Sequence, residues 1–149
     1  MTALYFAYGS NMNPARMARR GMRYVDSMPA ALGGWSLRFN KRAEGKRGIA
    51  YANIVPEREG RVEGVLYRLT EAAGITRMDP YEGYPVRYAR RIMEVETREG
   101  LQPAWVYIAS PDWQEEGLVP ERFYLNHLLS GRPWLSDEYF RDLARTVCC

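Results

Sequence analysis

The 149-residue chain contains little cysteine or histidine, and this scarcity excludes several kinds of site. Its only cysteines, Cys148 and Cys149, are adjacent at the C-terminus, a spacing that suits neither a disulfide framework nor a metal site. His127 is the only histidine. A structural zinc site is therefore excluded, and a Ser-His-Asp triad would depend on that single imidazole. We expect no bound metal.

Long apolar runs are also missing. No stretch approaches the ~18 consecutive apolar residues of a membrane-spanning helix, and the N-terminus lacks the regions of a signal peptide. We therefore expect a cytoplasmic protein with no membrane partner. With 46% hydrophobic, 13% aromatic and 26% charged residues, the chain has the composition of a globular protein that buries a core. Because we find no repeat or linker, residues 1–149 are predicted to form a single domain.

Positive charge is concentrated in the first half of the chain. Residues 1–75 carry 12 basic and 6 acidic side chains, whereas residues 76–149 carry 9 and 12. This asymmetry favours an anionic ligand. An RNA-binding surface would use the early arginines together with nearby aromatic residues; these arginines are Arg16, Arg19, Arg20 and Arg23. Because no basic run of five residues accompanies them, a solvated helix face is preferred and no nucleic-acid partner is expected.

Hydrophobic periodicity and turn signals predict an α+β protein. The run Leu4–Tyr8 is typical of a buried strand, and Asn13 before Pro14 marks the start of a short helix that ends at Gly21. Further strands are expected at 35–40, 49–54, 62–69, 88–97 and 104–109. Helices are expected at 71–78, at 120–129 and after the capping residue Ser136. Such an order favours a mostly antiparallel, barrel-like sheet with flanking helices.

The first candidate site is the turn Tyr8-Gly9-Ser10-Asn11 between the first strand and the first helix. Glycine lets the backbone approach a ligand closely, and N–H groups near a helix N-terminus attract a carboxylate or a phosphate. The turn is not a nucleophile elbow, because no glycine stands two residues after Ser10. The residues alone leave open whether this is an anion cradle or an ordinary turn.

The second candidate site is the segment 78–88, which places Asp79 and Glu82 among three tyrosines and two prolines. This composition predicts a stiff, aromatic-lined loop. A carboxylate half buried by such neighbours has a raised pKa, as general acid–base catalysis near neutral pH requires. In one alternative, Asp79 caps a helix or pairs with Arg77 or Arg87, and Glu82 is solvated. In another, the two carboxylates hydrolyse a glycoside.

The two candidate segments together resemble the γ-glutamylcyclotransferase-like family, which includes the AIG2-like proteins. The resemblance is carried by Leu4-Tyr5-Phe6-Ala7-Tyr8-Gly9-Ser10-Asn11-Met12 and by Asp79-Pro80-Tyr81-Glu82-Gly83-Tyr84-Pro85-Val86-Arg87-Tyr88. Tyr107 and Tyr124 fit the C-terminal pattern of this family, so the resemblance extends over nearly the whole chain. Asp79-Pro80-Tyr81 is closer to its bacterial and AIG2-like members than to the animal enzymes of glutathione metabolism. The implied fold is a small mixed β-barrel.

The resemblance also implies a cofactor-free enzyme that cyclises a γ-glutamyl amide to 5-oxoproline and releases the amine. Glu82 would be its general acid–base group, facing the backbone of residues 9–11 across a cavity sized for one glutamyl unit. The implied substrate-binding residues are Tyr5, Phe6, Ala7, Tyr8, Gly9, Ser10, Asn11, Tyr107 and Tyr124. The alternative is a non-catalytic carboxylate-binding module of the same fold. The amine is left open among an amino acid, a small metabolite and a lysine ε-amine, and either a monomer or a homodimer is expected.

Overall fold

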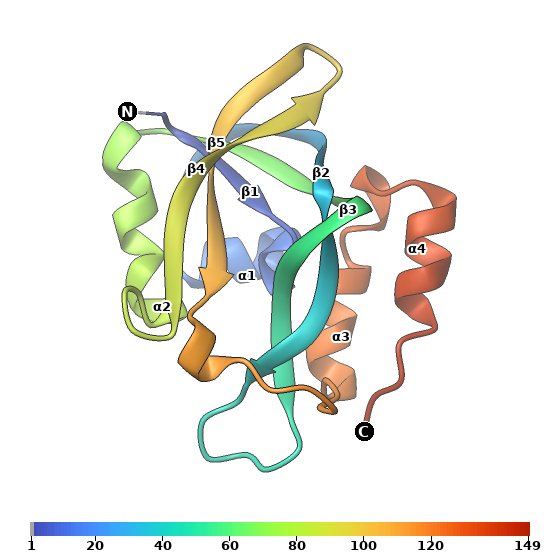
Figure 1. Cartoon of the computed structure of the whole chain (residues 1–149). Helices are drawn as coiled ribbons and strands as arrows, with labels where there is room; N and C mark the ends of the chain where they lie inside the picture. The colour runs from blue at the N-terminus through green and yellow to red at the C-terminus, as the bar shows by residue number, and fades with distance from the viewer. Residues whose placement is uncertain (1) are drawn as a thin grey trace.

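The computed structural model describes residues 2–149, and in this range five strands close into a β-barrel with helices outside it (Figure 1). The strands are β1 (Leu4–Ala7), β2 (Tyr24–Arg42), β3 (Ala50–Leu69), β4 (Tyr88–Thr97) and β5 (Gly100–Ala109). Their order around the barrel is β1, β3, β2, β4, β5. Neighbouring strands are antiparallel except β1 and β5, which are parallel. The predicted α+β class with a mixed, mostly antiparallel barrel is confirmed.

Two long, curved strands, β2 and β3, form much of the barrel wall (Figure 1). The prediction of three separate strands in this region is wrong. The segments predicted at 49–54 and 62–69 belong to one continuous strand, and the segment predicted at 35–40 begins much earlier, at Tyr24. Both strands contain turn-forming residues, which predict a strand end in the sequence. In the structure the sheet bends at these residues and the strands continue.

Glycines allow the close backbone contacts that these bends require. The register between β2 and β3 shifts between Gly33 and Trp35, where the pair bends. A Cβ on Gly60 would lie 2.3 Å from the carbonyl oxygen of Trp35, so a larger residue does not fit. A Cβ on Gly64 would likewise lie 2.3 Å from the carbonyl oxygen of Ala7. Glycine on β3 therefore lets β1 lie directly against it.

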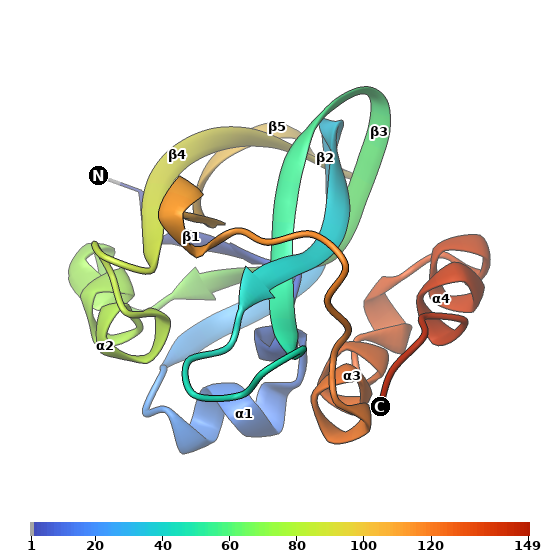
Figure 2. The ribbon, with the colours of Figure 1, turned by 60° about the horizontal axis from the view of Figure 1, so that its bottom comes forward.

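Four helices and several 3₁₀ turns surround the barrel within residues 2–149. They are α1 (Pro14–Arg19), α2 (Asp79–Glu82), α3 (Arg122–Leu129) and α4 (Asp137–Ala144), with η1 (Ser10–Met12), η2 (Ala72–Arg77), η3 (Pro111–Trp113) and η4 (Arg132–Trp134). Figures 1 and 2 show α2 on the opposite side of the barrel from α3 and α4, with α1 between them. Asn13 and Ser136 cap α1 and α4 as predicted, accepting hydrogen bonds from the N–H groups of Ala15 and Tyr139.

The segment 78–88 is not simply a loop, because α2 lies within it. Pro80 is tolerated since it occupies the first turn of the helix, where a backbone N–H has no intrahelical partner. Gly83 ends the helix with a left-handed φ of 68°. The helix predicted at 71–78 is the shorter 3₁₀ segment η2. Glu82 is therefore the last residue of a helix rather than part of an irregular bend.

The barrel and the helices share a common core. Phe6 of β1, Tyr67 of β3 and Leu125 of α3 are each fully buried in it. Because β1 contributes buried residues along its whole length, the turn that follows it is anchored to the centre of the molecule. No helix in the described part of the chain is long and apolar enough to cross a membrane.

Candidate active site

A cavity of about 300 Å³ lies at the end of β1, next to α2. This volume is at the lower end of the range for small-molecule sites and suits a compact ligand. The predicted site residues that line the cavity are Tyr5, Phe6, Tyr8, Gly9, Ser10, Asn11, Glu82, Tyr107 and Tyr124. The fold therefore brings the turn after β1 and the acidic residue of α2 to one cavity, although they are far apart in the sequence.

Ala7 is an exception to the predicted set, because it does not line the cavity. Its side chain is buried in the core, and its carbonyl oxygen lies against Gly64 of β3. Ala7 is thus the one predicted substrate-binding residue that does not line this cavity.

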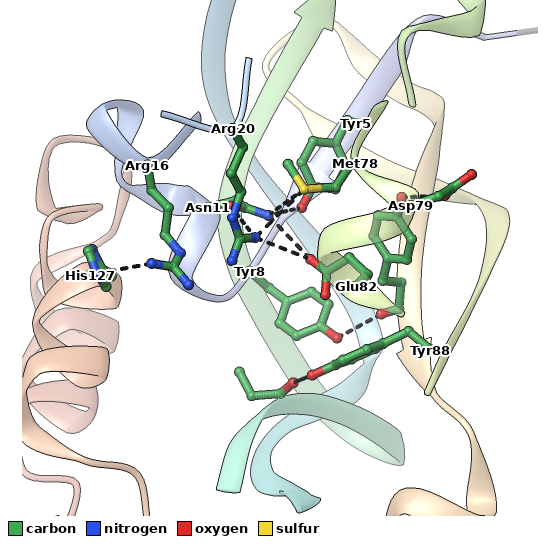
Figure 3. A network of polar contacts seen from close by, with 12 residues as sticks. Tyr5, Tyr8, Asn11, Arg16, Arg20, Met78, Asp79, Glu82, Tyr88 and His127 are labelled. Carbon is green, nitrogen blue, oxygen red and sulfur yellow. Dashed lines mark hydrogen bonds and ion pairs between the residues drawn. The ribbon is translucent and has the colours of Figure 1, made fainter. Parts of the chain in front are cut away.

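Glu82 is the only carboxylate among the described residues that line the cavity. Its side chain is 17% exposed, so the alternative in which Glu82 is solvated is wrong. Asn11 Nδ2 donates a hydrogen bond to Glu82 Oε1 at 3.3 Å, and Arg20 Nη1 lies 4.0 Å from the same oxygen (Figure 3). Burial raises the pKa of the Glu82 carboxyl, and the positive charges of Arg20 and Lys41 oppose that rise.

Asn11 connects the turn after β1 to Glu82. Its Oδ1 accepts a hydrogen bond from Arg20 Nη1 at 3.2 Å, which leaves Nδ2 as the donor toward Glu82. The same Nδ2 donates to the hydroxyl oxygen of Tyr5 at 2.8 Å. The backbone carbonyl of Asn11 accepts a hydrogen bond from the Tyr67 hydroxyl at 2.7 Å. With both its side chain and its backbone held, Asn11 fixes where the carboxylate lies relative to the turn.

The tyrosine hydroxyl groups around the cavity have different roles. Tyr8 donates to the carbonyl oxygen of Tyr107 at 2.7 Å, and Tyr107 donates to Asp79 Oδ1 at 2.7 Å. The Tyr124 hydroxyl oxygen instead accepts a hydrogen bond from the Ala52 N–H at 3.0 Å. Tyr124 therefore keeps its own proton for a ligand. Tyr107, which is also among the expected substrate-binding residues, already uses its proton within the protein.

Asp79 holds the beginning of α2. Both of its carboxylate oxygens accept hydrogen bonds from Arg90, at 2.8 and 3.0 Å, in addition to the bond from Tyr107. The suggested pairing with Arg77 or Arg87 is wrong, because the partner comes from β4. Asp79 does not line the cavity. The structure thus does not bring two carboxylates together there, and glycoside hydrolysis loses its support.

The early arginines are divided between the cavity and the surface. Arg16 of α1 and Arg20, the residue that follows this helix, are four residues apart, and both line the cavity. Arg19 and Arg23 are exposed, so the expectation of a solvated face holds only for them. Arg16 Nη1 lies 3.4 Å from His127 Nε2 (Figure 3). Burial and then the charge of Arg16 lower the pKa of His127, which favours the neutral imidazole beside Arg16.

Sequence reasoning missed several cavity residues on the barrel strands. Lys41 of β2, Tyr51 of β3 and Tyr88 of β4 all line the cavity. No local motif marks Lys41 or Tyr51, and only the excess positive charge of the first half indicated an anion-binding site. Tyr88 belongs to the second candidate segment but was not assigned a role there.

This chain is similar to known proteins in both sequence and fold. Residues 5–126 match the family model described as gamma-glutamyl cyclotransferase, AIG2-like. Curated protein sequences give no match. A solved structure described as gamma-glutamyl cyclotransferase has a TM-score of 0.81 at 21% identity, over 98% of this chain and 88% of that chain.

Two further solved structures have similar folds. YkqA from Bacillus subtilis has a TM-score of 0.83 at 26% identity, over 95% of this chain but 52% of that chain. A yeast gamma-glutamyl cyclotransferase described as specific to glutathione has a TM-score of 0.67 at 17% identity, over 99% of this chain and 98% of that chain. Since the family model matches most of the sequence, the chain belongs to the gamma-glutamyl cyclotransferase, AIG2-like family.

Proposed function

We propose that this chain is a γ-glutamylcyclotransferase, which cyclises a γ-glutamyl amide to 5-oxoproline and releases the amine. The α-amino nitrogen of the glutamyl unit attacks its own γ-carbonyl carbon, and the bond from that carbon to the leaving nitrogen breaks. The observation that carries the proposal is the position of Glu82, the only carboxylate among the described cavity residues, beside the turn after β1. Membership of the family supports the same choice of reaction.

Glu82 is the proposed carrier of both protons. The attacking amine must lose a proton and the departing nitrogen must gain one, and a single carboxylate between them can perform both transfers. Burial raises the pKa of the Glu82 carboxyl and so makes it a stronger base than a solvated carboxylate. Arg20, 4.0 Å away, favours the ionised form that must accept the first proton.

The proposed role of the cavity is to hold the glutamyl chain folded back on itself. Ring closure is intramolecular, so fixing the reactive conformer supplies much of the available rate enhancement. The N–H groups of Ser10 and Asn11 lie in the first turn of η1, where backbone donors lack intrahelical partners. These donors and Tyr124 suit the glutamyl α-carboxylate or the oxyanion that forms on the γ-carbonyl. The Tyr124 oxygen lies 3.5 Å from where a Cβ of Gly9 would be.

The proposal is tested by measuring 5-oxoproline released from γ-glutamyl amino acids, glutathione and γ-glutamylamines. We expect Glu82→Gln to lower kcat/KM by 10²–10⁴-fold, or about 3–5 kcal/mol, because it removes the proton carrier. Glu99→Gln is the matched control, since Glu99 is exposed in the turn between β4 and β5, and it should retain activity.

Circular dichroism and binding of a γ-glutamyl compound will establish that the Glu82→Gln protein is folded. Wild-type turnover in this folded variant would remove Glu82 from the mechanism. If the wild-type protein binds γ-glutamyl compounds and never converts them, the chain is instead a carboxylate-binding module of the same fold.

A further inference from the structure

Lys41 places a buried positive charge in the wall of the same cavity. The residue is 3% exposed, and its Nζ is surrounded by aromatic rings. The distances from Nζ to the ring centroids are 4.9 Å for Trp113, 5.3 Å for Tyr51 and 5.7 Å for Tyr88. Within residues 2–149, no carboxylate lies at ion-pair distance from this ammonium group. A buried ammonium that has no carboxylate in direct contact is costly, which favours an anionic ligand beside it.

The surroundings of Lys41 increase this excess of positive charge. The guanidinium groups of Arg42 and Arg87 lie 4.4 and 5.5 Å from the Trp113 ring, which also contacts Lys41. In the described part of the chain, Glu44 forms an ion pair with Arg87 at 2.6 Å, and the charge of Glu82 acts on Lys41 from beyond ion-pair distance. Arg42 donates to a backbone carbonyl rather than to an acid. The local field therefore attracts a further anion.

The cavity thus has cations on two sides of Glu82. Arg20 approaches the carboxylate from the side of α1, whereas Lys41 comes from β2. Tyr88, whose ring lies beside Lys41, is on the other side of Glu82 from Arg20 (Figure 3). A ligand that spans the site would accordingly carry an anionic group at each end. Burial, and then the charge of Arg87, lowers the pKa of Lys41 to about 8, so the ammonium is still mostly protonated at pH 7.

A γ-glutamyl amide has one carboxylate on its glutamyl half, and we take the turn after β1 as its site, which is one of the two roles proposed above for the donors of that turn. The second anion must then lie on the amine half, beyond the bond that breaks. We propose that Lys41 is a specificity-determining residue that binds a carboxylate on the amine half, so the enzyme prefers γ-glutamyl amino acids or peptides to γ-glutamylamines that lack this group. This inference rests on the proposed function for its reaction but makes a separate statement about binding.

The test compares γ-glutamylalanine with γ-glutamylethylamide, two compounds that differ only in the carboxylate of the amine half. We expect wild-type kcat/KM to be about 10- to 100-fold higher for γ-glutamylalanine, because a charge-assisted contact is lost with the ethylamide. Lys41→Met should remove this preference, mainly through KM for γ-glutamylalanine, and Lys41→Arg should restore part of it. Lys46→Met is the matched control, since Lys46 is exposed and pairs with Glu121 at 3.0 Å.

Binding of the two compounds is also measured by calorimetry in proteins that carry Glu82→Gln, with and without Lys41→Met. Tighter binding of γ-glutamylalanine than of γ-glutamylethylamide to the Glu82→Gln protein, with no such difference when Lys41→Met is added, supports the inference independently of turnover. If neither compound yields 5-oxoproline but this binding preference is found, the proposed reaction fails and the carboxylate site stands. Equal binding of both compounds, or an equal loss for both in Lys41→Met, overturns the role of Lys41.

Discussion

Replacing Asp79 by asparagine tests whether the start of α2 positions the carboxylate at its end. Asp79 accepts two hydrogen bonds from Arg90 and one from the Tyr107 hydroxyl, and it does not line the cavity. Asp79→Asn removes the charge while keeping the size of the side chain. We expect α2 to lose its attachment to β4 and β5, and Glu82 to be held less firmly as a consequence.

The size of the effect follows from the burial of the ion pair. The side chains of Arg90 and Asp79 are 11% and 15% exposed, and removing one partner of a buried pair costs about 3–5 kcal/mol. The lower end applies because the Arg90 guanidinium keeps its contacts with the rings of Tyr84 and Trp105, at 4.5 and 4.4 Å. A loss of about 3 kcal/mol corresponds to a decrease in Tm of roughly 6–12 °C for a domain of this size.

Urea and thermal unfolding measure this loss, and release of 5-oxoproline measures the effect on activity. We expect kcat to fall by about 10²-fold, with a smaller change in KM, because a small displacement of Glu82, the proposed proton carrier, impairs the chemical step more than binding. Asp142→Asn is the matched control, since its pair with Arg145 is largely exposed and should contribute less than about 1 kcal/mol. Unchanged stability would refute the argument from burial, and unchanged kcat in a destabilised protein would refute the positioning role.

Two further predictions concern the stability of the fold. Burial raises the pKa of Glu82 in the folded state, so the native protein binds this proton more tightly than the unfolded chain, and stability falls as the pH rises through the folded-state pKa. The glutamine of Glu82→Gln cannot ionise, so the free energy of unfolding of this variant, relative to the wild type, should increase between pH 4 and pH 8. Urea unfolding measures this change, with Glu99→Gln as the control. A difference in unfolding free energy that stays constant with pH would contradict a costly buried carboxylate. Gly64→Ala should destabilise by about 1–3 kcal/mol, because its Cβ would lie 2.3 Å from the Ala7 carbonyl oxygen. Gly33→Ala, whose Cβ would lie 3.6 Å from Glu96, is the control and should change stability by less than about 1 kcal/mol. Equal effects of the two substitutions would show that the contact between Gly64 and the Ala7 carbonyl is not rigid.

The sequence alone determined features that depend on neighbouring residues. The Asn13-Pro14 start of α1 and the Ser136 cap of α4 were predicted correctly, because a cap uses donors two or three residues away. The strand 88–97 was also predicted with its correct bounds, since turn signals stand on both sides of it. The turn Tyr8–Asn11 and Glu82 were recognised as motifs, and each motif is contained in a few consecutive residues.

Only the tertiary structure decided which distant groups meet. The continuity of β2 and β3 through their bends depends on pairing between the two strands, which outweighs the local turn signals. The partner of Asp79 is Arg90 rather than a closer arginine, because α2 packs against the neighbouring strands and not along its own segment. Lys41 reaches the cavity because barrel closure brings β2 beside β4. The charge and burial around Glu82 come from elements far apart in the chain, so the raised pKa on which its proposed role rests depends on the fold as a whole.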